Sequence, residues 1–311
     1  MTPRQACPLC GGDETTKLYT LADPNFATVQ CRRCRFIFMS PYPTDAFLHE
    51  HYLSIKLYGF EGETPELYAR SMNDRIVLFE TLFGKTGLPL RKGYAVDFGA
   101  GMGMAVAALK KLGFDAIGIE KNPQAAAVGK TLFEVDIFDI DLEMLSRTID
   151  LFTLFDVLEH IKYPKSFLAA VREKMSEDAT IIGAVPNYNG IGRILHGTRS
   201  ASLIFPEHVN QFTKQTLQKT LDDGGFDVLY TGFPPPYGVT ITLRLRAKLR
   251  KILGEGSAMR LIANLLVKLK KYVVYPLPNW FAESTGLFGH SLVFVARKRA
   301  KNDPARIAPS V

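Results

Sequence analysis

A glycine-rich turn at residues 96–103 constrains the fold of this chain more than any other feature. The run VDFGAGMG begins as an apolar strand, carries an acidic residue, and continues with glycines at every second position before a helical pattern starts. Glycines in such a turn tolerate positive φ and keep side chains out of a ligand's way. Backbone N–H groups and a helix N-terminus then approach a charged or polar ligand closely. The turn predicts a cofactor pocket but does not identify the cofactor.

From residue 93 onward the sequence alternates between strand-like and helix-like segments. This alternation, with continuous apolar strands, predicts an α/β fold with a doubly wound, mostly parallel sheet of seven strands. A separate helical pattern covers residues 65–83. The expected strands are 94–98, 115–120, 132–135, 150–155, 179–185, 226–231 and 291–296, and the expected helices are 103–112, 122–130, 164–175 and 213–223.

Composition divides the chain into three expected regions. A cysteine-rich module occupies residues 1–40, a helical linker follows over 41–92, and the main domain extends over 93–299. The main domain includes a basic amphipathic helical insertion at about 234–288, which is far longer than an ordinary connection between strands.

All four cysteines lie in the N-terminal module as two C-x-x-C pairs separated by 20 residues. Two such pairs supply four thiolates in a tetrahedral array around Zn²⁺, and they leave no open position for catalysis. We therefore expect a small zinc-ribbon-like module with a structural metal. A redox dithiol is the competing interpretation. The expected ligands are Cys7, Cys10, Cys31 and Cys34.

Acidic residues follow the predicted strands at regular intervals. The glycine spacing departs from the G-x-G-x-x-G pattern of dinucleotide-binding folds, because residue 104 is Met104 and the third glycine is Gly103. The second strand ends at Glu120, whose carboxylate is suited to accept hydrogen bonds from ribose hydroxyls. With Asp136 and the DVLEH segment at 156–160, these residues make the chain resemble the class I S-adenosylmethionine-dependent methyltransferases, and the glycine spacing disfavours NAD as the alternative ligand.

The resemblance covers residues 93–232 and the final strand, and it implies a Rossmann-like methyltransferase fold. It also implies a set of cofactor contacts. The glycine loop lies under the methionine end of the cofactor, the acid after strand two binds ribose, and the acid after strand three reaches the adenine amino group. Strand four carries the next acid into the cleft. The residues implied are Asp97, Gly99, Gly101, Gly103, Glu120, Asp136 and Asp156.

Two histidines are candidates for the base that methyl transfer to an O–H, N–H or acidic C–H group requires. His160 follows Glu159 after strand four, and its alternative role is to form the pocket wall. His208 follows Glu207 in a loop before a helix, and its alternative role is to fix the start of that helix. The chain is also similar to ubiquinone-biosynthesis-type methyltransferases and to sugar C-methyltransferases that begin with a four-cysteine module. In the latter, a Glu-His pair matching Glu207-His208 supplies the base.

Positive charge is concentrated near the C-terminus. Residues 241–301 contain 13 of the 38 Lys and Arg residues but only 2 of the 31 Asp and Glu residues. Within this region, 241–273 reads as one or two basic amphipathic helices. Three interpretations stay open: a lid packed on the domain, a surface that contacts anionic lipid, and an RNA-binding face. Sparse aromatic residues within 241–271 disfavour RNA.

The sequence therefore predicts an S-adenosylmethionine-dependent methyltransferase that acts on a small-molecule, sugar or lipid-linked acceptor. The alternatives are an RNA methyltransferase that grips RNA with the zinc module and basic segment, and a non-catalytic cofactor-binding or scaffold protein. The sequence shows neither a secretory signal nor an apolar run of about 18 residues. We accordingly expect a cytoplasmic protein, which the lipid interpretation of 241–273 would place at the inner face of the membrane.

Overall fold

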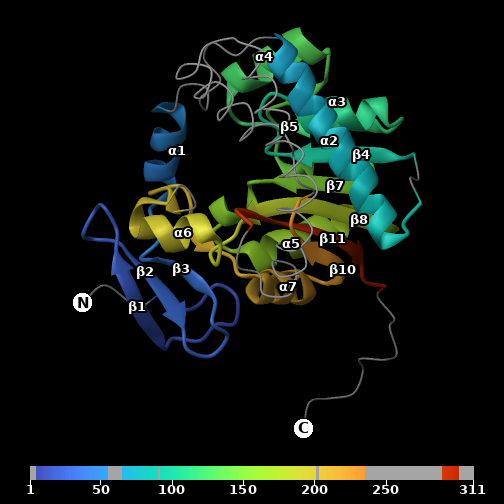
Figure 1. Cartoon of the computed structure of the whole chain (residues 1–311). Coiled ribbons are helices and arrows are strands. Elements are labelled where there is room, and N and C mark those ends of the chain that lie inside the picture. The colour runs from blue at the N-terminus through green and yellow to red at the C-terminus, as the bar shows by residue number, and fades with distance from the viewer. Residues whose placement is uncertain (1–4, 55–64, 90–91, 201–202, 235–288, 301–311) are drawn as a thin grey trace, which may run out of the picture.

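The computed structural model describes residues 5–54, 65–89, 92–200, 203–234 and 289–300 (Figure 1). The basic segment predicted over 241–273 lies outside the described residues, as does all of the expected insertion except its first residue. Among the helices of the described ranges, none combines the length and apolar character that a membrane crossing requires.

The larger sheet has seven strands in the order β10-β11-β8-β7-β4-β5-β6. All neighbouring pairs from β8 to β6 are parallel, and β11 is antiparallel to both β10 and β8. This mostly parallel α/β sheet confirms the predicted fold class. The strands are β4 (Tyr94–Phe98), β5 (Asp115–Ile119), β6 (Ile137–Phe138), β7 (Ile149–Phe155), β8 (Met175–Pro186), β10 (Phe226–Gly232) and β11 (Ser291–Lys298).

Helices cover both faces of this sheet, because side chains of its central strands alternate between two apolar clusters. Along β7, Leu151 and Phe155 belong to the cluster formed with α2 and α3, whereas Phe152 and Leu154 belong to the cluster formed with α5 and α7. A parallel strand buried on both faces reads as the continuous apolar run seen in the sequence. The main helices are α2 (Pro65–Thr86), α3 (Met104–Lys111), α4 (Pro123–Phe133), α5 (Pro164–Lys174) and α7 (Lys214–Asp223).

The strand predicted at 132–135 is wrong. Helix α4 continues to Phe133, since Asn122 caps its start and the helix ends only at Glu134, which takes a left-handed conformation (φ 53°). The third strand of the parallel set is the two-residue β6, so Asp136 precedes this strand instead of following it.

The N-terminal residues form a second, antiparallel sheet. Strands β1 (Thr15–Thr20), β2 (Ala27–Cys31) and β3 (Ile37–Ser40) are joined at the β3 edge by β9 (Asn210–Gln211). Figure 1 shows these strands beside the larger sheet. The rings of Phe36 and Phe212 meet edge to face, with their centroids 5.5 Å apart. The cysteine-rich module and the loop that carries Glu207 and His208 therefore share one sheet and one core.

Further short elements were not predicted from the sequence. Helix α1 (Asp45–Ser54) connects the N-terminal sheet to the rest of the chain, and α6 (Ile191–His196) follows β8. Short 3₁₀ helices in the described ranges include Leu142–Met144, Leu158–His160 and Gly197–Arg199.

Candidate functional site

The glycine loop between β4 and α3 has one face closed by packing and one open position. Gly99, Gly101 and Gly103 all have positive φ, at 70°, 53° and 73°. A Cβ on Gly99 would lie 2.5 Å from Val157, and one on Gly103 would lie 2.7 Å from Val135, whereas a Cβ on Gly101 would meet no described atom within 4 Å. Two glycines are therefore needed for close packing, and Gly101 leaves space in front of the loop.

Two carboxylates flank this loop, and one of them bonds its backbone. Asp97 is 3% exposed, and Thr153 Oγ1 donates a hydrogen bond to its Oδ1 at 2.6 Å. Burial raises the pKa of Asp97 to about 6. Glu120, directly after β5, accepts hydrogen bonds from the backbone N–H groups of Gly101 and Asn122, each at 2.7 Å. The Glu120 carboxylate thus lies against the open position of the loop.

Asp136, expected to follow the third strand and reach adenine, precedes that strand. The exposed Asp136 pairs with Lys110 at 2.8 Å and lies before β6. The residue that directly follows β6 is Asp139, which pairs with Lys121 at 2.9 Å. The run VDIFDID carries acids on both sides of its apolar pair, and this pattern was the available signal for Asp139.

A second group of polar side chains gathers after β7. Asp156 takes a left-handed conformation (φ 56°) at the end of this strand, and Glu159 and His160 follow in a 3₁₀ turn. The tertiary structure brings His208 against this turn, so that the rings of His160 and His208 lie 4.9 Å apart and nearly perpendicular. Glu159, His160 and His208 each present one nitrogen or oxygen atom, and these atoms lie within 4.8 Å of one another. We call these three residues the Glu-His-His cluster.

Burial dominates the electrostatics of the Glu-His-His cluster. Glu159 is 1% exposed, and neither of its carboxylate oxygens has a hydrogen-bond partner among the described residues. Burial raises the pKa of Glu159 well above its usual range, and the nearby charge of Asp156 adds to this shift. Burial, followed by the charge of His208, lowers the pKa of His160 to about 3. The His160 imidazole is therefore neutral near pH 7.

Helix α1 supplies two polar contacts that the sequence analysis missed. The Tyr52 hydroxyl lies 2.9 Å from His160 Nδ1. His51 Nε2 lies 3.0 Å from Glu207 Oε1, and Glu207 is only 7% exposed. Glu207, which precedes His208 in the candidate base loop, thus contacts a histidine of α1. No sequence motif marks α1, because its contacts cross more than 100 residues of chain.

Helix α2 adds a positive charge to the acidic ends of the central strands. The Arg75 guanidinium lies over the Phe155 ring, 4.1 Å from its centroid. Its charge acts against the burial-driven rise in the pKa of Asp97. Arg75 was also not singled out by the sequence.

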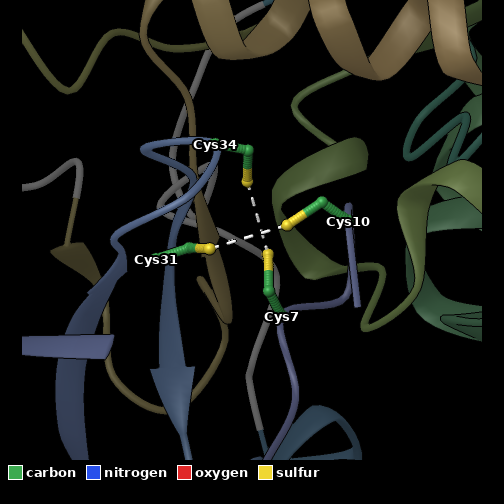
Figure 2. A group of neighbouring side chains, drawn as sticks. All are labelled: Cys7, Cys10, Cys31 and Cys34. Atoms are coloured by element: carbon green, nitrogen blue, oxygen red, sulfur yellow. Dashed lines mark hydrogen bonds between the residues drawn. The ribbon is translucent and has the colours of Figure 1, made fainter. Parts of the chain in front are cut away.

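The four cysteines converge on one point, as Figure 2 shows. The Sγ atoms of Cys7 and Cys34 lie 3.6 Å apart, as do those of Cys10 and Cys31, so these are free thiols and not disulfides. Zn–S bonds of about 2.3 Å in a tetrahedron place sulfurs about 3.8 Å apart, close to this spacing. Each C-x-x-C pair is followed by a left-handed residue, Gly11 or Arg35, and so both pairs form the same tight turn.

Comparisons with known proteins agree with this fold. The model of a methyltransferase domain family matches residues 68–231. The mitochondrial ubiquinone biosynthesis O-methyltransferase of Schizosaccharomyces pombe is 23% identical over 124 residues, which are 37% of this chain and 43% of that protein. The chain thus matches less than half the length of this relative.

Solved structures that match this chain are more distant in sequence. A SAM-dependent methyltransferase from Archaeoglobus fulgidus is 18% identical, with a TM-score of 0.46 over 82% of this chain and 100% of its own. A complex of the Haloferax volcanii Trm112 methyltransferase activator with a methyltransferase matches at 16% identity and a TM-score of 0.48, over 76% of this chain and 96% of its own. Since the family model covers more than half of the sequence, this chain belongs to the methyltransferase domain family, as a class I S-adenosylmethionine-dependent methyltransferase.

Proposed function

We propose that the loop around Gly101 and the carboxylate of Glu120 hold S-adenosylmethionine, with Asp156 beside the reacting end. The open position at Gly101 and the adjacent carboxylate support this assignment, because adenosine offers hydroxyl groups to such an acceptor. For the adenine amino group, Asp139 is a better candidate than Asp136, since it follows β6. When bound, S-adenosylmethionine supplies an electrophilic methyl group on a sulfonium centre.

We further propose that His208 removes the acceptor's proton. The single observation that carries this assignment is the contact between His208 and His160, which brings the loop before α7 to the carboxyl end of β7. Imidazole is the side chain used most often for such proton transfer. The acceptor's nucleophile attacks the methyl carbon, the methyl–sulfur bond breaks, and the acceptor's proton passes to His208. In this scheme His160 forms the wall behind His208.

The proposed acceptor is a hydroxyl group of a small-molecule, sugar or lipid-linked compound. The enclosed position of His208, which is 9% exposed, supports a compact acceptor. The name of the S. pombe relative, an O-methyltransferase, supports oxygen as the methylated atom.

The four cysteines are proposed to hold a structural Zn²⁺. All four ligand positions belong to the protein, so the metal stabilises the fold and takes no part in the methyl transfer. The module at 1–40 then acts on the active site through β3, which pairs with β9 next to the His208 loop. Residues 41–92 serve as the helical linker to the methyltransferase domain at 93–299.

The test uses the full chain, methyl-labelled S-adenosylmethionine and a fractionated cell extract. We expect label in a small-molecule or lipid fraction, with turnover falling at least about 100-fold in His208→Ala. Cofactor affinity, measured by calorimetry, should not change in that variant. The exposed His196→Ala is the matched control and should keep wild-type turnover.

Two results would contradict the proposal. Label recovered in the RNA fraction would replace the small acceptor with RNA. Wild-type turnover in His208→Ala would remove the base role from that residue. If cofactor affinity fell instead of turnover, His208 would belong to the cofactor pocket.

A further inference from the structure

We propose that the Glu-His-His cluster binds a divalent transition-metal cation at the carboxyl end of β7. The inference deepens the proposed function, on which it rests for the location of the proton transfer, and it assigns that location a metal ligand set. The site is separate from the four-cysteine site, because the two clusters share no residue.

The three candidate ligand atoms lie near one another in the folded chain. One atom each from Glu159, His160 and His208 lies within 4.8 Å of the other two. In a tetrahedral site with bonds of about 2.1 Å, neighbouring ligand atoms lie about 3.4 Å apart. The separations between the three atoms must therefore shorten by up to about 1.4 Å. Two imidazoles with one carboxylate form a ligand set known for zinc and for non-haem iron sites.

The second, independent observation is the unpartnered carboxylate of Glu159. Both of its oxygens are buried, and no described residue donates a hydrogen bond to either. A buried carboxylate without a partner is costly, and proteins normally provide it with a hydrogen bond, an opposite charge or a metal. Among the described residues, the two imidazoles are the groups placed to share a cation with it.

Contacts around the cluster match the outer shell of a metal site. Metal-binding histidines usually engage their second ring nitrogen in a hydrogen bond, which fixes the orientation of the ring. The Tyr52 hydroxyl contacts Nδ1 of His160, so that Nε2 would be the ligand atom. Gln211 Nε2 donates to the backbone oxygen of His208 at 3.2 Å and supports that loop from the other side.

Three protein ligands leave open positions on the cation. A hydroxyl oxygen of the acceptor suits such a position, because a bound cation lowers the pKa of an oxygen ligand. With a cation bound, His208 would serve as one of its ligands, and the cation would favour transfer of the acceptor's proton to a water molecule. Without it, His208 removes the proton directly. Both cases place the proton transfer at the same cluster.

The test is a titration of the zinc-loaded full chain with Mn²⁺, followed by electron paramagnetic resonance of the free ion. Mn²⁺ prefers oxygen and nitrogen ligands over thiolates, so the four-cysteine site does not compete for it. We expect one Mn²⁺ per chain in the wild type and no saturable binding in His208→Ala. The nearly isosteric Glu159→Gln should weaken binding at least about tenfold, and Tyr52→Phe, as an outer-shell change, about tenfold or more.

Matched controls are the exposed His196→Ala and Glu143→Gln, which should bind Mn²⁺ like the wild type. Wild-type affinity in Glu159→Gln would overturn the inference, as would a wild type that binds no more Mn²⁺ than His208→Ala. Circular dichroism of both variants checks that they are folded. Because the titration needs neither cofactor nor acceptor, its failure is distinct from a failure of the labelled-transfer experiment.

Discussion

The hydroxyl of Tyr52 lies 2.9 Å from Nδ1 of His160, which joins helix α1 to the turn after β7 across 108 residues of chain. His160 packs in turn against His208. Tyr52, in the linker, thereby orients His160, which contacts the proposed base His208. The linker itself carries no catalytic motif.

Replacing Tyr52 with Phe removes this hydrogen bond and keeps the aromatic ring. We expect a loss of about 1 kcal/mol in the free energy of unfolding and a fall in turnover with unchanged cofactor affinity. Denaturant titration and the labelled-transfer assay measure the two effects. Tyr163→Phe, at an exposed ring, is the control and should leave both quantities unchanged. Equal turnover in the two variants would show that Tyr52 does not position His160 for the reaction.

A side chain at Gly101 is expected to block the cofactor. The open space in front of this residue would be filled by the new side chain in Gly101→Arg, so cofactor affinity should fall at least about 100-fold, or about 3 kcal/mol. Gly87→Arg is a close control, because Gly87 also has positive φ and also lacks described atoms within 4 Å of an added Cβ. Both variants carry similar backbone strain of about 1–2 kcal/mol, and only the first should fail to bind in calorimetry. Wild-type affinity in Gly101→Arg would place the cofactor elsewhere.

Removing zinc is expected to loosen the His208 loop as well as the N-terminal module. The physical link is the pairing of β3 with β9 and the contact between Phe36 and Phe212. Hydrogen exchange after chelation should rise over residues 5–40 and also at Asn210 and Gln211, whereas β5 should stay protected. If exchange rose only in residues 5–40, the module and the loop would be independent.

The buried Asp97 predicts a specific pH dependence of stability. Its pKa is raised from 3.8 to about 6, chiefly by burial, so the protonated form is favoured in the folded state. The stability that this proton provides is complete below pH 3.8 and is lost as the pH rises through 6. Asp97→Asn keeps a neutral side chain that still accepts from Thr153. As the pH rises from 5 to 8, the free energy of unfolding of this variant, relative to the wild type, should therefore increase by about 1 kcal/mol.

Denaturant titrations of the two proteins across this range measure the difference in the free energy of unfolding. The exposed Glu143→Gln serves as the control, and it should track the wild type at every pH. A constant difference between Asp97→Asn and the wild type would contradict the raised pKa.

The sheet and the glycine loop were predictable because their signals are local. The strand ending at Phe98, the glycines at alternate positions and Glu120 lie within 27 residues, and their spacing reflects one strand–turn–helix–strand unit. The two C-x-x-C pairs are equally local, since each tight turn needs only four residues and the left-handed residue after it. The third strand was misplaced because its two residues, Ile137 and Phe138, are too few to produce a periodic pattern.

The sequence by itself determined the fold class, the methyltransferase family and the two clusters of glycines and cysteines. Only the tertiary structure decided which groups surround His208. His51 reaches Glu207 across 156 residues, and Tyr52 reaches His160 across 108. Such contacts depend on how β3 pairs with β9 and how α1 packs on the turn after β7. Because short-range periodicity carries no information on those distances, the set of residues at the candidate site is defined only when the chain is folded.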